Sequence, residues 1–288
     1  MFGVMLVASI GIIYSVSNTI RGAVSPNTEF IFLKLFTIRG LEGIPFSDFQ
    51  SFVTLFVPII SILLVFDAIN SERNSGTMSR LLSQPIYRDA VINGKFLAGV
   101  TTIAIMLTSL VLLLCGLGLR MIGIAPSAEE ASRLLFFLIT AIIYGAFWLG
   151  LAILFSVLFR QVALSALAPI AIWLFFFIFI NLIAMMLSQY IAPGDTQAAQ
   201  VRAAEIQQMI LRISPIQLFY EAMNNLLIPE INIIQRIYSS PGFVVPNPLT
   251  IGQSLLTVWP HLVTIVVLTV ICFAISYVRF MREEIRSL

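Results

Sequence analysis

The sequence predicts an all-α integral membrane protein with six transmembrane helices. Of its 288 residues, 59% are hydrophobic and 10% are charged, whereas ordinary soluble domains carry about 25% charged residues. The mean hydropathy is +1.00. The apolar residues form long continuous runs, while the strands of a transmembrane barrel alternate over segments of about ten residues. Helices rather than strands are therefore expected to cross the lipid.

Six segments are apolar over the roughly 20 residues that a helix needs to cross a bilayer. Each is nearly free of ionisable side chains, which cost about 2.5–3.5 kcal/mol apiece at the centre of a membrane helix. Pro58 and Pro169 fall inside two of them and are tolerated, because neighbouring helices can satisfy the freed carbonyl groups. We expect a single transmembrane domain over 1–288 with spans at about 2–20, 50–67, 96–119, 134–159, 162–187 and 259–280.

The first expected span, 2–20, differs from a secretion signal. No basic residue precedes its apolar run, and no small-residue cleavage pattern follows it. We therefore expect a retained helix, with Met1 already at the start of the span.

Basic residues near the span ends predict the orientation, because cytoplasmic loops are enriched in Lys and Arg. Six spans put both termini on one side, together with the loop 67–95 between the second and third spans. Each side holds eight basic residues, but three of those opposite lie in the long segment 188–258, and the rule counts only loops shorter than about 60 residues. Eight against five places both termini and loop 67–95 in the cytoplasm of a multi-pass plasma-membrane protein, with 188–258 outside.

Several kinds of site are not expected. The basic residues lie scattered at span ends, with no basic face interleaved with aromatic residues, so we expect no nucleic-acid partner. Cys115 and Cys272 fall inside spans and are interpreted as packing residues rather than as a disulfide or metal pair. The one histidine, His261, permits no paired-histidine metal motif, and its place two residues after Trp259 favours an interfacial anchor.

Catalytic motifs are also missing from the sequence. The only Gly-Lys pair, Gly94-Lys95, is followed by Phe96 and does not belong to a phosphate-binding loop. The nucleophile motif GxSxG does not occur, and no charged residue lies in the middle of a span. We therefore expect no enzyme activity and no cofactor in this chain. Asn181 is the clearest polar residue in a late span, and it is interpreted either as an interhelical hydrogen bond or as a substrate contact.

Two elements on the outer side are expected to be helical. Residues 29–38 are too short to cross the membrane and too apolar to float, so they lie along the outer surface or pack on helix ends. In the long outer loop, Asp195 and Thr196 can cap a helix whose apolar residues recur at helical spacing. Those apolar residues are Ile206, Met209, Ile210 and Ile213.

A second helix in the outer loop is expected to begin at the run Ser214 to Gln217. This run has the form of a capping box with Pro215 at the first helical position. The helix shows Phe219, Met223 and Leu226 or Leu227 on one face and stops before Pro229. The two outer helices are consistent either with a lid or re-entrant element at the mouth of a pathway or with a packing cap on the helix bundle.

The loop 67–95 is the longest polar stretch in the chain. The second span can continue through Ala68 to Ser71, after which Asn74, Ser75 and Gly76 break the helix, because Gly and Asn accept left-handed turn geometry. A short helix can then begin, with Thr77 as its cap. Its apolar face consists of Met78, Leu81 and Leu82, with Arg80 pointing away, and it ends at Gln84 and Pro85.

This short amphipathic helix, flanked by charges such as Glu72 and Arg73, is suited to a groove on another protein. The alternative is a solvated connector between two spans. The sequence pattern alone does not separate the two interpretations.

The same loop resembles a known family. Asp67, Glu72, Gly76-Thr77, Leu81-Leu82-Ser83, Pro85, Arg88 and Gly94-Lys95 are similar to the pattern between the second and third spans of the type-2 ABC transporter permeases. The resemblance is strongest to the subfamily that includes the permease of the nitrous-oxide-reductase maturation transporter. It covers about 30 residues here, and the six spans and the SPIQLFY run extend it less specifically. Such permeases usually begin with a basic amphipathic helix, whereas this sequence begins within a span.

The resemblance implies a function and a set of partners. The loop would carry a coupling helix that docks on a separate cytoplasmic ABC ATPase subunit, which binds ATP and Mg. Two permeases, either a homodimer or a pair with a similar permease, would form the pathway, with room for an extracytoplasmic subunit. The candidate ATPase-binding residues are Asp67, Glu72, Arg73, Gly76, Thr77, Met78, Arg80, Leu81, Leu82, Pro85 and Arg88.

The expected function is therefore that of an exporter-type permease driven by a partner ATPase, with a substrate that the sequence does not identify. One alternative is a non-transporting membrane anchor or force-transmitting subunit that acts on an extracytoplasmic partner through 188–258. An ion-coupled carrier is disfavoured, because such carriers use charged residues within their spans.

Overall fold

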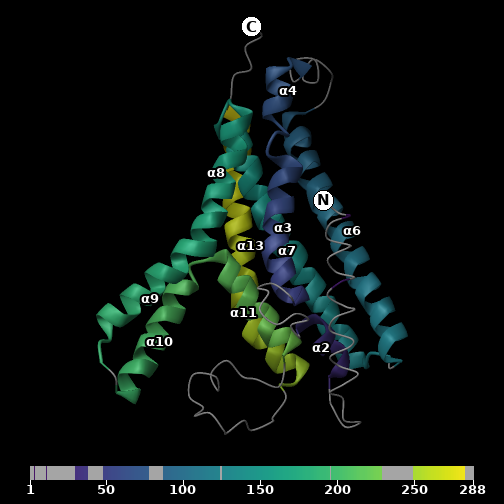
Figure 1. Cartoon of the computed structure of the whole chain (residues 1–288). Helices are drawn as coiled ribbons and strands as arrows, with labels where there is room; N and C mark the ends of the chain where they lie inside the picture. The colour runs from purple at the N-terminus through teal and green to yellow at the C-terminus, as the bar shows by residue number, and fades with distance from the viewer. Residues whose placement is uncertain are drawn as a thin grey trace. The chain divides into compact units, whose positions relative to one another are not determined.

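The computed structural model describes residues 3, 11, 30–37, 48–77, 87–123, 125–194, 196–228 and 249–282, and regular structure within these ranges is helical (Figure 1). The helices in chain order are α2 (Ile31–Thr37), α3 (Phe49–Val65), α4 (Asn70–Asn74), α6 (Arg88–Ile122), α7 (Ala128–Leu158), α8 (Val162–Leu174), the π-helix η1 (Phe175–Phe179), α9 (Ile180–Ile191), α10 (Gln197–Leu211), α11 (Pro215–Leu227) and α13 (Ile251–Arg282).

Five helical stretches in the described part of the chain are long and apolar enough to cross a membrane. They correspond to the last five expected spans, and the all-helical fold class is confirmed. The first expected span, 2–20, lies almost wholly outside the described residues. The five stretches are Phe49–Asn74, Arg88–Arg120, Ala128–Leu158, Val162–Ile191 and Ile251–Arg282.

Several helices are longer than their apolar cores. α6 begins at Arg88 rather than near Phe96, and α13 begins at Ile251 rather than at Trp259. Hydropathy marks where a helix is apolar, whereas backbone hydrogen bonding continues through polar residues on either side. The expected outer loop, 188–258, is therefore shorter than predicted, because α9 and α13 occupy both of its ends.

The stretch Val162–Ile191, which corresponds to the fifth expected span, is not a regular α-helix. α8 changes into the five-residue π-helix η1 before α9 resumes α-helical geometry. The run is rich in phenylalanine, and Phe175 and Phe179 stack with ring centroids 6.2 Å apart. No residue pattern in this apolar run predicted the change of hydrogen-bond register.

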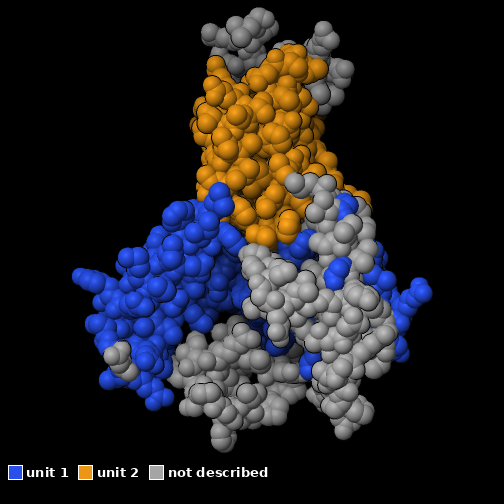
Figure 2. Space-filling model, viewed as in Figure 1, with its two compact units in different colours: residues 1–54, 109–140, 174–262 blue, residues 55–108, 141–173, 263–288 orange. Residues whose placement is uncertain are grey.

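The chain divides into two compact units, which Figure 2 shows in separate colours. Unit 1 comprises residues 1–54, 109–140 and 174–262. Unit 2 comprises residues 55–108, 141–173 and 263–288. Long helices such as α6, α7 and α13 contribute residues to both.

In unit 1, α2 is a packing element. Its residues Phe32, Leu33, Leu35 and Phe36 are at most 3% exposed. The Phe36 ring meets Phe49 edge-on at 5.4 Å between centroids and lies 6.1 Å from Phe137. Of the two alternatives for residues 29–38, the described part therefore matches packing on helix ends.

Also in unit 1, α9 and α10 form a hairpin (Figure 1). The Thr196 side chain accepts a hydrogen bond from the Ala199 amide, as expected for a helix cap, while Asp195 lies outside the described residues. The expected apolar face of α10 is not buried, since Met209 and Ile213 are 67% and 65% exposed. Such a face is available to lipid or to another protein.

In contrast, α11 is deeply buried within unit 1. Phe219, Met223, Leu226 and Leu227 are at most 2% exposed, and the helix ends at Leu227, as expected. Pro215 occupies the first turn. The predicted capping box is wrong, because Ser214 makes no side-chain cap and Gln217 donates its hydrogen bond to Glu221 instead. α11 thus matches the packing alternative.

Unit 2 is built on a close approach of α3, α6 and α7. A Cβ atom on Gly145 of α7 would lie 3.0 Å from Ile103 and 3.2 Å from Val57. Small residues at such crossings let membrane helices come close enough for extensive van der Waals contact. Beside it, Tyr144 and Trp148 are fully buried and meet edge-on at 6.3 Å between centroids.

Candidate functional site

The polar segment after α3 is held in a defined conformation. α3 ends at Val65, a turn covers 66–69, and α4 follows. The Ser71 amide donates to the Asp67 carbonyl at 2.9 Å, so helical hydrogen bonding resumes directly after the turn. Gly76 has φ of 72°, a left-handed value that Gly tolerates without strain. The expected break at Gly76 is present, whereas the expected continuation of the helix through Ala68 to Ser71 is interrupted by the turn at 66–69.

The side chains of Glu72 and Lys95 form an ion pair in unit 2. Nζ of Lys95 lies 2.6 Å from Oε1 of Glu72 and also donates to the Ala68 carbonyl. The two side chains are 29% and 20% exposed. Because α4 precedes residues 78–86 and α6 follows them, this pair joins the two sides of the loop.

The turn before α4 is also fixed to neighbouring helices of unit 2. The Ile69 amide donates to Oγ of Ser156 on α7 at 3.2 Å. Oγ of Ser165 on α8 donates to the Phe66 carbonyl at 2.8 Å. Two completely buried serines thus satisfy a carbonyl group left without a helical partner at the end of α3 and an amide group left without one at the start of α4.

Asn70, the first residue of α4, is completely buried. Neither its amide nitrogen nor its amide oxygen has a hydrogen-bond partner among the residues that the structure describes. Burying a polar group in this way costs about 1–3 kcal/mol.

The predicted ATPase-binding residues fall into two groups, those that the structure describes and those that it does not. Asp67, Glu72, Arg73 and Arg88 are partly exposed, and Gly76 and Thr77 are exposed. The Thr77 hydroxyl lies 3.4 Å from the Glu72 carbonyl, so its role as a cap for a following helix stays a prediction. The segment predicted to form the coupling helix lies outside the described residues, which leaves Met78, Arg80, Leu81, Leu82 and Pro85 without a structural account.

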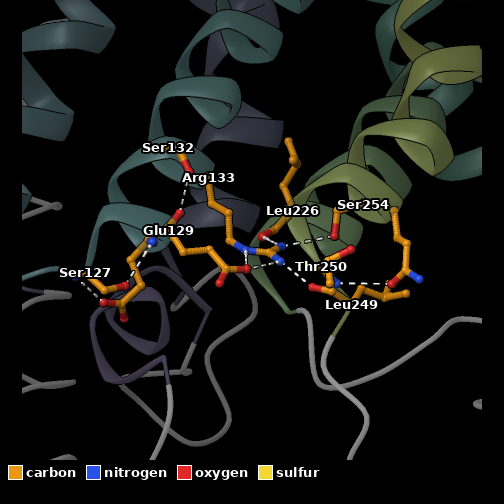
Figure 3. Close-up of polar contacts among 10 residues, drawn as sticks. Ser127, Glu129, Ser132, Arg133, Leu226, Leu249, Thr250 and Ser254 are labelled. Carbon is orange, nitrogen blue, oxygen red and sulfur yellow. Dashed lines mark hydrogen bonds and ion pairs between the residues drawn. The ribbon is translucent and has the colours of Figure 1, made fainter.

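A second polar cluster, the Arg133 cluster, lies in unit 1 (Figure 3). Arg133 is completely buried. Its guanidinium group donates to the Glu129 carboxylate at 2.8 Å, to Oγ of Ser254 at 3.0 Å and to the Leu226 carbonyl at 3.1 Å. It also donates to the Leu249 carbonyl. Arg133 therefore connects α7 with the end of α11 and the start of α13.

A third polar cluster, the Glu221 cluster, also lies in unit 1. Oε2 of Glu221 is 2.9 Å from both Nε2 of His261 and Nε of Arg212, and Gln217 donates to the other oxygen at 3.1 Å. Burial opposes ionisation of Glu221, but the hydrogen bonds from His261 and Gln217 and the charge of Arg212 outweigh it and hold the pKa of the carboxyl below its ordinary value.

His261 was interpreted as an interfacial anchor, and that interpretation is wrong. The side chain is 8% exposed and faces Glu221, whereas Trp259 is 67% exposed. On a helix, residues two apart point in different directions, so the anchor role fits Trp259 alone.

Asn181 bonds within its own helix rather than across an interface, since its amide donates to the Phe177 carbonyl at 3.1 Å. Cys115 and Cys272 are free thiols. Within the described ranges, no group of three or more His, Cys, Asp and Glu side chains is arranged to hold a metal ion.

In the sequence, Lys95 stands out only as the end of the loop, Arg133 and Arg212 only as basic residues on the outer side, and His261 only as an interfacial anchor. A lone charge next to an apolar run is compatible with either a solvated end or a buried partner. The pairing becomes visible only when distant segments meet, and Glu72 and Lys95 are 23 positions apart.

The chain belongs to the ABC-2 transporter family. Residues 4–285 match the family described as ABC-2 family transporter protein, and the five apolar helices agree with the membrane subunits that make up this family. The membrane subunits of this permease family are not themselves catalytic.

Two curated relatives are similar to part of the chain. The protein named "Probable ABC transporter permease protein NosY" from Pseudomonas aeruginosa is 28% identical over 151 residues, covering 50% of this chain and 53% of the relative. The protein of the same name from Stutzerimonas stutzeri is 27% identical over 156 residues, covering 51% and 54%. The chain therefore spans about half the length of the curated relatives it matches.

Proposed function

We propose that this chain is the transmembrane permease subunit of an ATP-binding-cassette exporter. A separate cytoplasmic ATPase subunit binds ATP and Mg and hydrolyses the nucleotide. This chain supplies the membrane helices and the loop 67–95 that receives the ATPase. The substrate is an unidentified molecule whose chemistry the apolar helices do not specify.

The mechanism is mechanical. Closure of two ATPase subunits around ATP moves the coupling loop, and the attached ends of α3 and α6 carry that movement into the membrane helices. Because α4 is only a short turn away from α3, a displacement of the loop is transmitted to the helix rather than absorbed by a long flexible linker. The helices then alternate between conformations that open the pathway to either side.

The observation that carries this proposal is the constrained loop between two long apolar helices. A solvated connector does not require two buried serines and an ion pair to hold its ends. A loop that transmits force does require such attachments. Family membership and the similarity to proteins named as ABC transporter permeases support the same assignment.

Further features of the proposal concern assembly and orientation. Six spans, with residues 2–20 as the first, make half of a pathway, so the functional unit contains two permeases, either identical or similar. Both termini and the coupling loop lie in the cytoplasm, with the segment 188–258 on the opposite side.

The proposal is tested by purifying the tagged chain from the membranes of its native host and identifying its partners by mass spectrometry. A P-loop ATPase of the ABC class is expected at one copy per permease. Leu82→Ala should reduce the retained ATPase about fivefold or more, since truncating a central apolar residue at an interface commonly costs more than 1 kcal/mol. Equal membrane yield of the variant shows that insertion is intact.

Leu112→Ala is the matched control, because Leu112 is 66% exposed on α6, away from the loop. It should retain the ATPase at the wild-type level. Wild-type protein without an ABC ATPase would contradict the proposal. An ATPase that binds without transport of any tested substrate would favour the force-transmitting alternative.

A further inference from the structure

The carboxylate of Glu72 is occupied within the chain. One oxygen, Oε1, receives the Lys95 ammonium group at 2.6 Å. The other, Oε2, is buried and has no partner among the residues described. The charge of Glu72 is therefore already paired within the chain, although the side chain is 29% exposed.

Lys95 is held from two sides. Besides Glu72, its ammonium group donates to the carbonyl of Ala68, which lies in the turn between α3 and α4. Lys95 itself stands in the third turn of α6, so the contact spans the whole loop. The ammonium group thereby joins two groups on one side of the loop, the Ala68 carbonyl and the Glu72 carboxylate, to α6 on the other side.

The second attachment is independent of charge. The Ile69 amide is bonded to Ser156 of α7, next to the completely buried Asn70. α4 is therefore fixed at its start to α7 and in its middle to α6. These contacts all lie within unit 2.

We propose that the Glu72–Lys95 pair is an internal latch that fixes the two ends of the coupling loop relative to each other, so that Glu72 is a positioning residue and not a contact for the ATPase. This inference rests on the proposed function for the identity of the partner. A change of charge at Glu72 is then expected to weaken ATPase binding because the two ends of the loop are no longer held together, and not because a contact with the ATPase is lost.

The test uses charge exchange in the full-length chain. Four forms are compared in lipid nanodiscs: wild type, Glu72→Lys, Lys95→Glu and the double exchange Glu72→Lys/Lys95→Glu. Spin labels at Thr77 and Tyr87, which are exposed on either side of 78–86, report the distance across the loop. This measurement does not need the ATPase.

A narrow distance distribution is expected in wild type, a broad one in each single variant and an intermediate one in the double exchange, which restores the ion pair but not the hydrogen bond to the Ala68 carbonyl. In parallel, each single variant should bind the co-purified ATPase about tenfold more weakly, within the range of coupling between contacting residues, and the double exchange should recover part of that loss. Glu205→Lys, an exposed carboxylate on α10, is the control and should change neither measurement.

Distances that stay narrow in the single variants would overturn the latch. A double exchange that binds the ATPase no better than Glu72→Lys would also overturn it, since a direct contact from Glu72 to the ATPase is not restored by Lys95→Glu. Failure of the wild type to bind an ABC ATPase would instead count against the proposed function, while the distances would still decide the latch.

Discussion

At the scale of single residues, Arg133 is buried with a complete set of hydrogen-bond partners. All five of its N–H donors have acceptors, supplied by the Glu129 carboxylate, Ser254 and the carbonyls of Leu226 and Leu249. Its guanidinium group also lies 5.6 Å from the centre of the Phe30 ring. An ammonium group cannot reproduce this planar fork, so Lys is not a conservative replacement here.

Arg133→Gln should therefore lower the free energy of unfolding by about 2–4 kcal/mol, because it leaves buried carbonyls without donors. The pair with Glu129 adds little to this figure, since the Glu129 side chain is 42% exposed and screened by solvent. Denaturant titration of the purified protein in detergent measures the change. Arg202→Gln, at an exposed position on α10, should cost less than about 0.5 kcal/mol.

The Glu221 cluster predicts a pH dependence of stability. The pKa of this carboxyl lies below its ordinary value of 4.5 in the folded protein. A lowered folded pKa means that the unfolded chain binds the proton more readily, so stability from this group is complete above pH 4.5 and is lost as the pH falls through the lower folded pKa. The midpoint of thermal unfolding should decrease over that interval.

Glu221→Gln removes the titrating group while it retains most of the shape of the side chain. Its unfolding midpoint should be lower than that of the wild type at neutral pH, by the equivalent of about 1–3 kcal/mol for lost charge-assisted hydrogen bonds. The difference between the two proteins should shrink in acid. An equal acid sensitivity in both would show that other groups control it.

At the scale of elements, regular patterns predicted structure where local chemistry decides it. Gly76 adopts the left-handed turn, Thr196 caps α10, and α11 begins at Pro215 and buries the expected face. The sequence did not predict which of several possible hydrogen-bond partners a capping side chain would take. Ser127 and Glu130 form a reciprocal capping box at the start of α7, whereas the similar run from Ser214 does not, because Gln217 bonds the buried carboxylate of Glu221.

The close helix approach at Gly145 gives a prediction for an element. Gly145→Val places its branched side chain against Ile103 and Val57 and should destabilise the protein by about 1–3 kcal/mol through overpacking. Gly116→Val on α6 is the matched control, since nothing lies within 4 Å of a Cβ at that position. Thermal unfolding of both variants in the same detergent separates overpacking from the common effect of a β-branched residue in a helix.

At the scale of the whole molecule, hydropathy was sufficient to predict five membrane helices, because a bilayer demands apolar length from each of them. The structure of the loop 67–95 and its contacts were predictable only in part. The loop, its break at Gly76 and its flanking charges follow from the sequence, but the pairing of Glu72 with Lys95 and the attachment to Ser156 depend on how distant helices pack.

The orientation gives a prediction for the whole chain. A cysteine introduced at Ser79 should react with a membrane-impermeant thiol reagent only after the membrane is opened, while one at Gln200 should react in intact cells. Both are compared in a background with Cys115 and Cys272 replaced by Ala. Labelling in the opposite order would reverse the assignment of the cytoplasmic side.

The central claim is that loop 67–95 receives an ABC ATPase, and cross-linking from within that loop tests it most directly. In native membranes, Ser79→Cys is treated with a short bifunctional thiol-to-amine reagent, and the adducts are identified by mass spectrometry, with Gln200→Cys treated in parallel. We predict that an ABC ATPase is captured from Ser79→Cys and not from Gln200→Cys. Membranes that contain the ATPase but yield no adduct from Ser79→Cys, or yield it from Gln200→Cys, would contradict the account.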